Sequence, residues 1–222
     1  MTAESSTILS VNVGLPRDYG SAGGTVLLEK PWRSAIRKSP VTGPVRVSST
    51  NLEGDAQADP REHGGPEMAV LAYSAEHYPV WRAELVRPDL PYGAFGENLT
   101  LSHLTEETIC IGDTLATGSV RLQVSMPRGP CANLTRLWRI PDLVERVNDK
   151  GWGGWYLRVL LEGTLEVGSA VDVAERPYPE WTVAQAQRIR ARRREDPETA
   201  AALAACPLLS ESWRAKLLSS HR

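Results

Sequence analysis

Cysteine is scarce in this sequence. The three cysteines, Cys110, Cys131 and Cys206, are an odd number and form no Cys-x-x-Cys pair. This pattern argues against a disulfide scaffold, a structural zinc site and an iron–sulfur cluster. A single cysteine can still carry chemistry, so each one has to be judged by its surroundings.

Long apolar runs and an excess of one charge are also missing. No apolar stretch reaches the roughly 18 residues of a membrane span, and the first residues lack the basic start and apolar centre of a secretory signal. The 25 basic and 27 acidic side chains leave a formal charge of -2, so nothing attracts nucleic acid or an anionic membrane globally. We therefore expect a cytoplasmic protein without a stable nucleic-acid or membrane partner.

What the sequence does contain, up to about residue 175, is a series of short β-type runs separated by Gly and Pro. Strands are predicted at residues 8–14, 45–49, 68–73, 98–102, 114–116, 120–126 and 170–174. Helices are predicted at residues 75–85, at 142–148 with Asp142 as the N-cap, and at 155–161. The pattern indicates a mainly β fold with covering helices, a barrel or a sandwich, and not a doubly wound sheet.

The composition changes after a Pro-rich turn at residues 176–180, and three helix-sized segments follow. Their predicted starts are a capping box at Thr182, a cap at Asp196 before Pro197, and Ser210. We place a domain boundary between residues 178 and 179, with domains at 1–178 and 179–222. Five arginines lie within residues 188–194, and an exposed helix face explains them better than contact with nucleic acid.

The loop at residues 52–66 is dense in polar groups and ends in two glycines. One interpretation is that Gly64 and Gly65 allow the backbone to approach a ligand while His63 lies beside it. A second is a divalent-metal site, typical of a hydrolase, built from Asp55, Asp59 and His63. A third is a solvated turn in which the Asp side chains cap backbone amides.

Three further stretches could carry chemistry. Glu97 and Asn98, in the turn after the only phenylalanine, could orient a ligand or could form a plain β-turn with an exposed Glu97. The basic stretch at residues 29–40 could bind phosphate or could be a solvated loop. The loop from Met126 to Cys131 is stiffened by two prolines at the exit of a strand.

Cys131 is the strongest of these candidates. Arg128 lies close to it in the chain, and a fixed cation favours the thiolate, which is a nucleophile and a soft metal ligand. Cys110 ranks far lower, because it lies inside an apolar run without a neighbouring cation. A buried structural Cys131 is the alternative.

Taken in order, these stretches resemble the MOSC family, named for the C-terminal part of molybdenum-cofactor sulfurases, and in particular its small YiiM-like bacterial branch. The resemblance spans almost the whole chain, and the segment from about Trp181 resembles the three-helix appendage of that branch. The segments that carry it are Ser34-Ala-Ile-Arg-Lys38, Gly54-Asp-Ala-Gln-Ala-Asp59 with His63-Gly-Gly65, Phe95-Gly-Glu-Asn-Leu99, Gly112-Asp113, Gln123-Val-Ser125 with Pro127-Arg-Gly-Pro-Cys131, and Gly154-Trp-Tyr-Leu-Arg-Val159.

The resemblance implies a MOSC β-barrel-like domain that binds the molybdopterin form of the molybdenum cofactor, with Cys131 as the metal ligand. It also implies reduction of N-hydroxylated compounds such as hydroxylaminopurines, hydroxylamines and amidoximes to amines or amidines, which would detoxify them. Since the chain has no iron–sulfur motif, the electrons would come from a separate reductase. The alternative is a non-redox module that carries molybdopterin or a sulfur-bearing ligand.

The remaining site residues follow from the same resemblance. Arg33, Lys38 and Arg128 are candidates for the pterin phosphate, because fixed cations suit a dianion. His63 and Asp55 are candidates for orienting substrate and delivering a proton. The full set of candidates for cofactor binding is Arg33, Ser34, Lys38, Gly64, Gly65, Asn98, Arg128 and Cys131.

Overall fold

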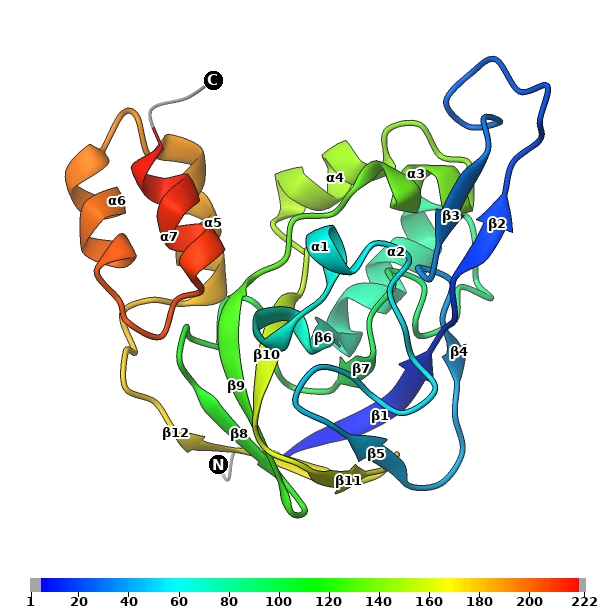
Figure 1. The fold of residues 1–222 in the computed structure, drawn as a ribbon. Helices are drawn as coiled ribbons and strands as arrows, with labels where there is room; N and C mark the ends of the chain where they lie inside the picture. Colours follow the sequence, from blue (N-terminus) through cyan, green and yellow to red (C-terminus); the bar gives the residue numbers. More distant parts are fainter. Residues whose placement is uncertain (1–4, 220–222) are drawn as a thin grey trace.

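Seven strands close into a barrel in the computed structural model, which describes residues 5–219 (Figure 1). Around the barrel the order is β12 (Ala170–Glu175), β8 (Thr114–Thr117), β9 (Val120–Pro127), β10 (Trp155–Leu161), β6 (Val70–Ser74), β7 (Leu99–Leu101) and β1 (Ser6–Val13). Pairing of β12 with β1 closes the ring. Only β6 and β7 run parallel among these neighbours. The predicted mainly β, barrel-like fold is confirmed.

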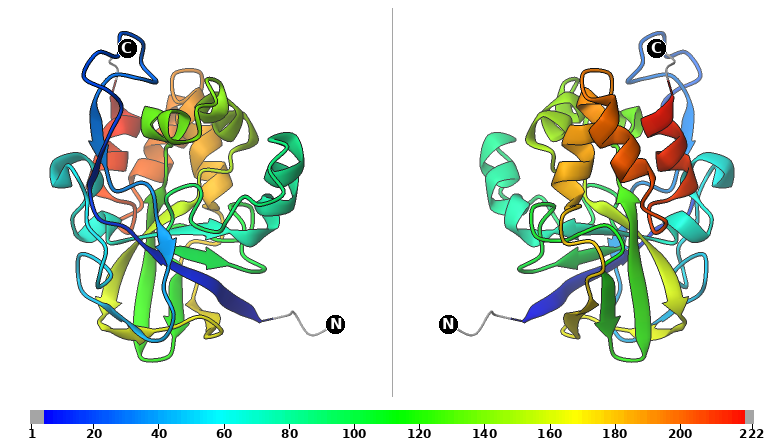
Figure 2. Two further views of the ribbon diagram at one scale, coloured as in Figure 1. Left: turned by 90° about the vertical axis from the view of Figure 1, so that its right-hand side faces the viewer. Right: turned by 90° about the vertical axis from the view of Figure 1, so that its left-hand side faces the viewer.

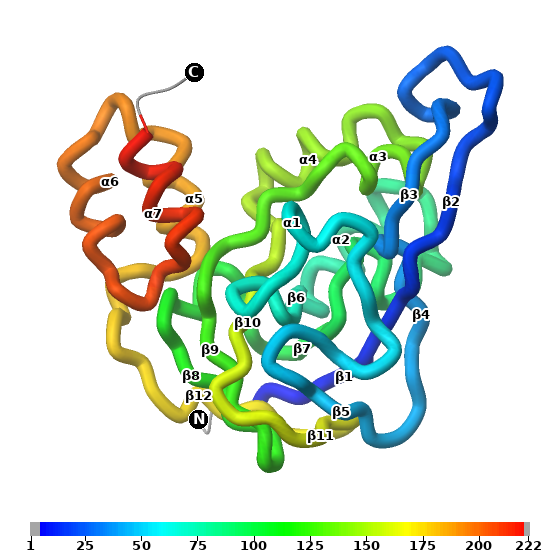
Figure 3. The backbone as a smooth tube through the Cα atoms, viewed as in Figure 1, coloured from blue at the N-terminus to red at the C-terminus, as the bar shows by residue number. Residues whose placement is uncertain are grey.

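The remaining strands are short additions to the barrel. β4 (Ser39–Pro40) extends the sheet beyond β1. Two separate ribbons are β5 (Val45–Val47) with β11 (Gly163–Leu165), and β2 (Arg17–Tyr19) with β3 (Trp32–Ser34). The β2–β3 ribbon projects from the body beside α3, as the tube view shows (Figure 3).

The seven strand segments predicted from the sequence are all present, with shifts of one or two residues at their ends. β9 shows why such runs predict strands: every second residue, Val120, Leu122 and Val124, faces the core. One prediction was wrong: residues 155–161 form strand β10 and not a helix. Trp155 and Leu157 are buried and Tyr156 is half-buried between them, which is the period of a strand. The segment is mostly apolar, which fits a helix or a strand, and the pairing of β10 with β9 and β6 decides between them.

Helices cover one end of the barrel (Figure 2). They are α1 (Pro60–His63), η1 (Pro66–Met68), η2 (Ala75–His77), α2 (Tyr78–Glu84), α3 (Ala132–Trp138) and α4 (Leu143–Lys150). The helix predicted at 75–85 is divided into a 3-10 turn and α2, with Pro79 in the first turn of α2. The helix predicted at 142–148 is α4, although the side chain of Asp142 makes no capping bond. Helix α3, which begins directly after Cys131, was not predicted from the sequence.

A second apolar core lies under these helices. Tyr73 stacks on Phe95 with ring centroids 4.6 Å apart, and Tyr78 and Trp81 of α2 pack around them. The carboxylate of Glu97 is fully buried here, not exposed as in a plain turn, and accepts from Gly93 N at 2.8 Å. Glu97 is thus a structural anchor for the turn.

The C-terminal unit consists of α5 (Val183–Arg192), α6 (Pro197–Ala204) and α7 (Glu211–Leu218), and it packs on one flank of the barrel (Figure 1). The predicted caps are confirmed, since side chains of Thr182, Asp196 and Ser210 each accept from a backbone N–H of the first turn. Its apolar residues belong to the same core as the barrel. The boundary at 178/179 stays a prediction. Within residues 5–219 no helix is long and apolar enough to cross a membrane.

Candidate functional site

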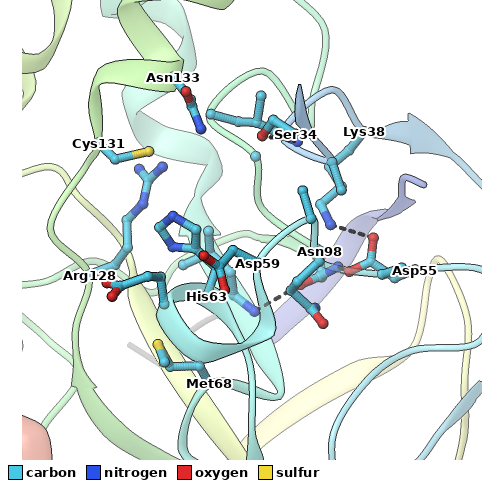
Figure 4. Close-up of a pocket in the computed structure, with 18 of the residues that line it drawn as sticks. Ser34, Lys38, Asp55, Asp59, His63, Met68, Asn98, Arg128, Cys131 and Asn133 are labelled. Carbon is cyan, nitrogen blue, oxygen red and sulfur yellow. Dashed lines mark hydrogen bonds and ion pairs between the residues drawn. The ribbon is translucent and has the colours of Figure 1, made fainter. Parts of the chain in front are cut away.

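A cavity of about 260 Å³ opens where the barrel meets α1 and the loop before α3 (Figure 4). It brings together the polar loop of residues 52–66, the basic stretch of 29–40 and the loop of Cys131, which the sequence keeps far apart. Its lining includes the predicted residues Arg33, Ser34, Lys38, Asp55, Asp59, His63, Asn98, Arg128 and Cys131, and also Gln57, Met68, Asn133 and Tyr156.

One wall of the cavity is a closed polar network around Asp55. Its Oδ1 accepts from Gly14 N at 2.7 Å and forms an ion pair with Lys38 Nζ, and its Oδ2 accepts from Asn98 Nδ2 at 2.9 Å. Asn98 is held in turn, since its Oδ1 accepts from Leu71 N at 3.0 Å. The side chains of Lys38 and Asp55 are only 8% and 1% exposed. Asp55 therefore serves as the counterion of Lys38 in this structure.

Burial destabilises the charged form of Lys38 in spite of that partner. Burial disfavours the ammonium form and lowers the pKa of Lys38 from its ordinary value of 10.5, against the opposing effect of Asp55. Its charge is already matched by a carboxylate at contact distance. Lys38 is thus a weaker anchor for an anionic ligand than its position alone suggests.

The opposite wall contains a buried cation without such a partner. Arg128 is 5% exposed, and its guanidinium donates to the carbonyls of Phe95 at 2.9 Å and Gly153 at 3.4 Å. Its backbone N–H also donates to Gly154 O at 3.0 Å. No ion pair joins it to a carboxylate within the described residues. A buried arginine held by neutral carbonyls keeps its full charge available to an anion in the cavity.

Cys131 stands beside Arg128 on this wall. It is half-buried and occupies the N-cap position of α3, but its side chain makes no capping bond. Figure 4 shows its sulfur near the Arg128 guanidinium, with Asn133 of α3 above. A thiol that is accessible, fixed by a helix start and next to a cation meets the requirements for a metal ligand.

Tyr156 of β10 completes this wall and was missed from the sequence. Burial raises the pKa of its phenol, the charges of Arg128 and Cys131 act on it in opposite directions, and it therefore stays protonated at neutral pH. The signal that could have found it is the alternation of β10, which turns Tyr156 toward the cavity when its neighbours face the core.

The other predicted residues differ in how they meet the cavity. His63 lines it from the last turn of α1 and is exposed. Gly64 and Gly65 do not line it: they form the turn from α1 into η1, where Gly65 has a φ of 94°. Arg33 lines it but is exposed and bonds Asp18 at 2.9 Å, and Ser34 Oγ accepts from Ile36 N at 3.1 Å.

The divalent-metal alternative does not fit this arrangement. Asp59 is the N-cap of α1 and accepts from Arg61 N at 3.1 Å, while Asp55 is engaged with Lys38. Among residues 5–219 no group of three or more His, Cys, Asp or Glu side chains is placed to hold a metal ion. Asp55, Asp59 and His63 therefore form no ligand set of their own.

The other two cysteines are structural. Cys110 and Cys206 are both buried in the core. Burial raises the pKa of the Cys110 thiol, with Asp113 acting in the same direction, so Cys110 stays a thiol at neutral pH. Its sulfur donates weakly to Pro179 O at 3.6 Å.

Comparison with known proteins identifies the family of this chain. A family model described as "MOSC domain" matches residues 59–172, and one described as "YiiM-like, 3-alpha helix domain" matches residues 181–219. The chain belongs to the MOSC domain family. The MOSC model includes His63, Asn98, Arg128, Cys131 and Tyr156, but not the segment that carries Lys38 and Asp55.

Individual relatives extend the similarity over nearly the whole chain. YflK from Bacillus subtilis is 38% identical over 218 residues, which cover 98% of this chain and 96% of that protein. A protein named "Reductase" from Gibberella moniliformis is 41% identical over 195 residues, covering 86% of this chain but only 33% of that protein. The crystal structure of YiiM from Geobacillus stearothermophilus is 34% identical with a TM-score of 0.79, covering 96% of this chain and 97% of that chain.

Proposed function

We propose that this MOSC protein is a molybdenum-cofactor-dependent reductase of N-hydroxylated compounds. The observation that carries the proposal is the pairing, on one cavity wall, of the accessible Cys131 thiol with the buried Arg128 that lacks a carboxylate partner. A thiolate suits a soft metal, and an unpaired guanidinium suits the phosphate of an anionic cofactor. MOSC membership and the reductase name of the Gibberella relative support a redox role.

The residues present fit such a cofactor. Cys131 would hold the metal and Arg128 the nearest anionic group, with Asn133 as a neutral hydrogen-bonding group beside them. Arg33 and Lys38 would contribute less, because each already has a carboxylate partner. When bound, the cofactor supplies the two-electron reduction that no side chain of this chain can perform.

Proton supply falls to the protein. Cleavage of an N–O bond to amine and water consumes two protons with the two electrons, which a separate donor protein would deliver. Tyr156 stays protonated at neutral pH and lies beside Cys131, so its hydroxyl can donate a hydrogen bond to the departing oxygen. His63 is exposed and lines the same cavity, which makes it a second candidate for proton delivery.

The test is expression in a host that makes molybdenum cofactor, followed by elemental analysis and an assay of hydroxylaminopurine reduction with an artificial electron donor. We expect Cys131→Ser to lose both bound molybdenum and activity, because its oxygen is a harder and weaker ligand than a thiolate. Cys206→Ser is the matched control, since Cys206 is buried away from the cavity, and it should retain both. Full molybdenum content and activity in Cys131→Ser would refute the mechanism, and cofactor binding without turnover would indicate a carrier module.

A further inference from the structure

A second cavity, of about 310 Å³, lies at the junction of the barrel domain with the three-helix unit. Its lining comes from α4 and the turn after it, from the Arg128–Gly129 loop, from α5 and from Trp213 of α7. We call it the junction cavity. It shares only Arg128 and Gly129 with the cavity of Cys131, so that loop separates the two.

The lining of the junction cavity is strongly basic. It contains Arg128, Arg190 and Arg193 and not one Asp or Glu. Gln187 and Asn148 add neutral hydrogen-bonding groups. Arg190 and Arg193 are close enough for their charges to repel each other, and no carboxylate among the lining residues offsets that repulsion.

The arginines of residues 188–194 do not all behave alike, contrary to the expectation of one exposed helix face. Arg188 pairs with Glu107 at 2.8 Å, and Arg192 is exposed. Arg190 and Arg193 instead turn into the junction cavity and are half-buried.

Neither of these two has a carboxylate partner within residues 5–219. Arg193 Nε is buried without a hydrogen-bond partner there, and its Nη1 donates only to the carbonyl of Arg190, at 3.1 Å. Arg190 lies over the ring of Trp213, 5.1 Å from the centroid. Burial together with the charge of Arg193 lowers the pKa of Arg190, as expected for a cation that lacks a counterion.

We propose that the junction cavity is a phosphate-binding site, distinct from the cofactor cavity. Planar guanidinium groups match phosphate oxygens in geometry and charge, and a dianion would relieve the repulsion between Arg190 and Arg193. The volume exceeds that needed by a phosphate ion, so the phosphate comes either free or as part of a nucleotide. Because Gly129 contacts both cavities, an occupant would also steady the loop that carries Arg128.

The test is calorimetric titration of the full-length, cofactor-free protein at constant ionic strength. The probes are inorganic phosphate, adenosine 5′-monophosphate and adenosine. Saturable binding of phosphate and the monophosphate, but not of adenosine, is expected. Tighter binding of the monophosphate than of phosphate would identify a nucleotide ligand, and equal binding would identify free phosphate.

Variants on α5 assign the binding to this cavity. Arg193→Gln should weaken phosphate binding by about tenfold or more, because a charged hydrogen bond is lost. Gln187→Glu keeps all three arginines and nearly the same shape but introduces a competing carboxylate, so it should have a similar effect even if Arg193→Gln folds poorly. Neither residue lines the cofactor cavity.

Arg192→Gln is the matched control, since it removes the same charge from an exposed position of the same helix, and it should bind phosphate as the wild type does. Three results would overturn the proposal: no saturable phosphate binding by the wild type, wild-type affinity in both Arg193→Gln and Gln187→Glu, or an equal loss in Arg192→Gln. Reductase activity plays no part in these measurements, so failure here leaves the proposed function untouched.

Discussion

The two walls of the Cys131 cavity each contain a buried cation but differ in how its charge is matched. On the Asp55 wall every partner is present, because Asp55 joins Lys38, Asn98 and the backbone of Gly14. On the Cys131 wall the cation Arg128 donates to carbonyls and has no carboxylate partner within the described residues, and the Cys131 side chain makes no capping bond. The contrast teaches that charge near a cavity does not define a binding wall. We expect a ligand to bind on the wall where a charge is held in place and left unmatched.

The largest effect should come from a substitution on the Asp55 wall, where each charge has a partner. Asp55→Asn removes the counterion of a buried lysine, and we expect the free energy of unfolding to fall by about 3 kcal/mol. Urea denaturation followed by circular dichroism measures this. Asp59→Asn is the control: it lies in the same loop but its side chain is 41% exposed, and Asn caps a helix as well as Asp does, so little change is expected. An equal loss in both variants would show that Asp55 is no special counterion.

A somewhat smaller effect is expected on the Cys131 wall, where Arg128 has no carboxylate partner. Arg128→Gln keeps hydrogen-bonding capacity but removes the unmatched charge, and retention of the anionic cofactor after gel filtration should fall by about tenfold or more. Arg33→Gln removes a charge that Asp18 already matches at the surface, and it should change cofactor content little. The ranking of the two cations is wrong if both variants lose cofactor alike.

Tyr156 is the protonated group on the Cys131 wall, and its phenol has no counterpart on the Asp55 wall. Tyr156→Phe should lower kcat by about tenfold through loss of one hydrogen bond in the reaction, with bound molybdenum unchanged. Tyr178→Phe, which removes a phenol that does not line the cavity, should leave kcat unchanged. Loss of molybdenum in Tyr156→Phe would mean that the hydroxyl holds the cofactor and does not assist the reaction.

The smallest effect concerns the pH dependence of the Asp55 wall. Since the pKa of Lys38 is lower in the folded protein than its ordinary value of 10.5, the unfolded chain binds more protons in the window between the two values. Stability contributed by this group should therefore rise as pH increases through the folded pKa toward 10.5. Unfolding of the wild type and Lys38→Met across this alkaline window measures the difference. A wild type that loses stability relative to Lys38→Met as pH rises would contradict the sign.

Local signals in the sequence were sufficient for most of the fold. The alternation of Val120, Leu122 and Val124 predicts β9 without reference to its neighbours. The caps at Thr182, Asp196 and Ser210 mark helix starts, because they bond backbone groups only a few residues away. Local signals did not predict β10, because its strand conformation depends on pairing with β6 and β9 on either side.

The sequence by itself determined the family and the β-rich architecture. It also favours Cys131 over Cys110 as the reactive cysteine, because a stiff loop beside a cation differs from an apolar run within a few residues. Only the tertiary structure decided which cations lack a carboxylate partner. Lys38 meets Asp55 and Arg33 meets Asp18 across separate strands and loops, while Arg128, Arg190 and Arg193 meet no carboxylate in residues 5–219. The physical reason is that ion pairing acts over a few ångströms in space, and the chain folds residues of any separation into that distance.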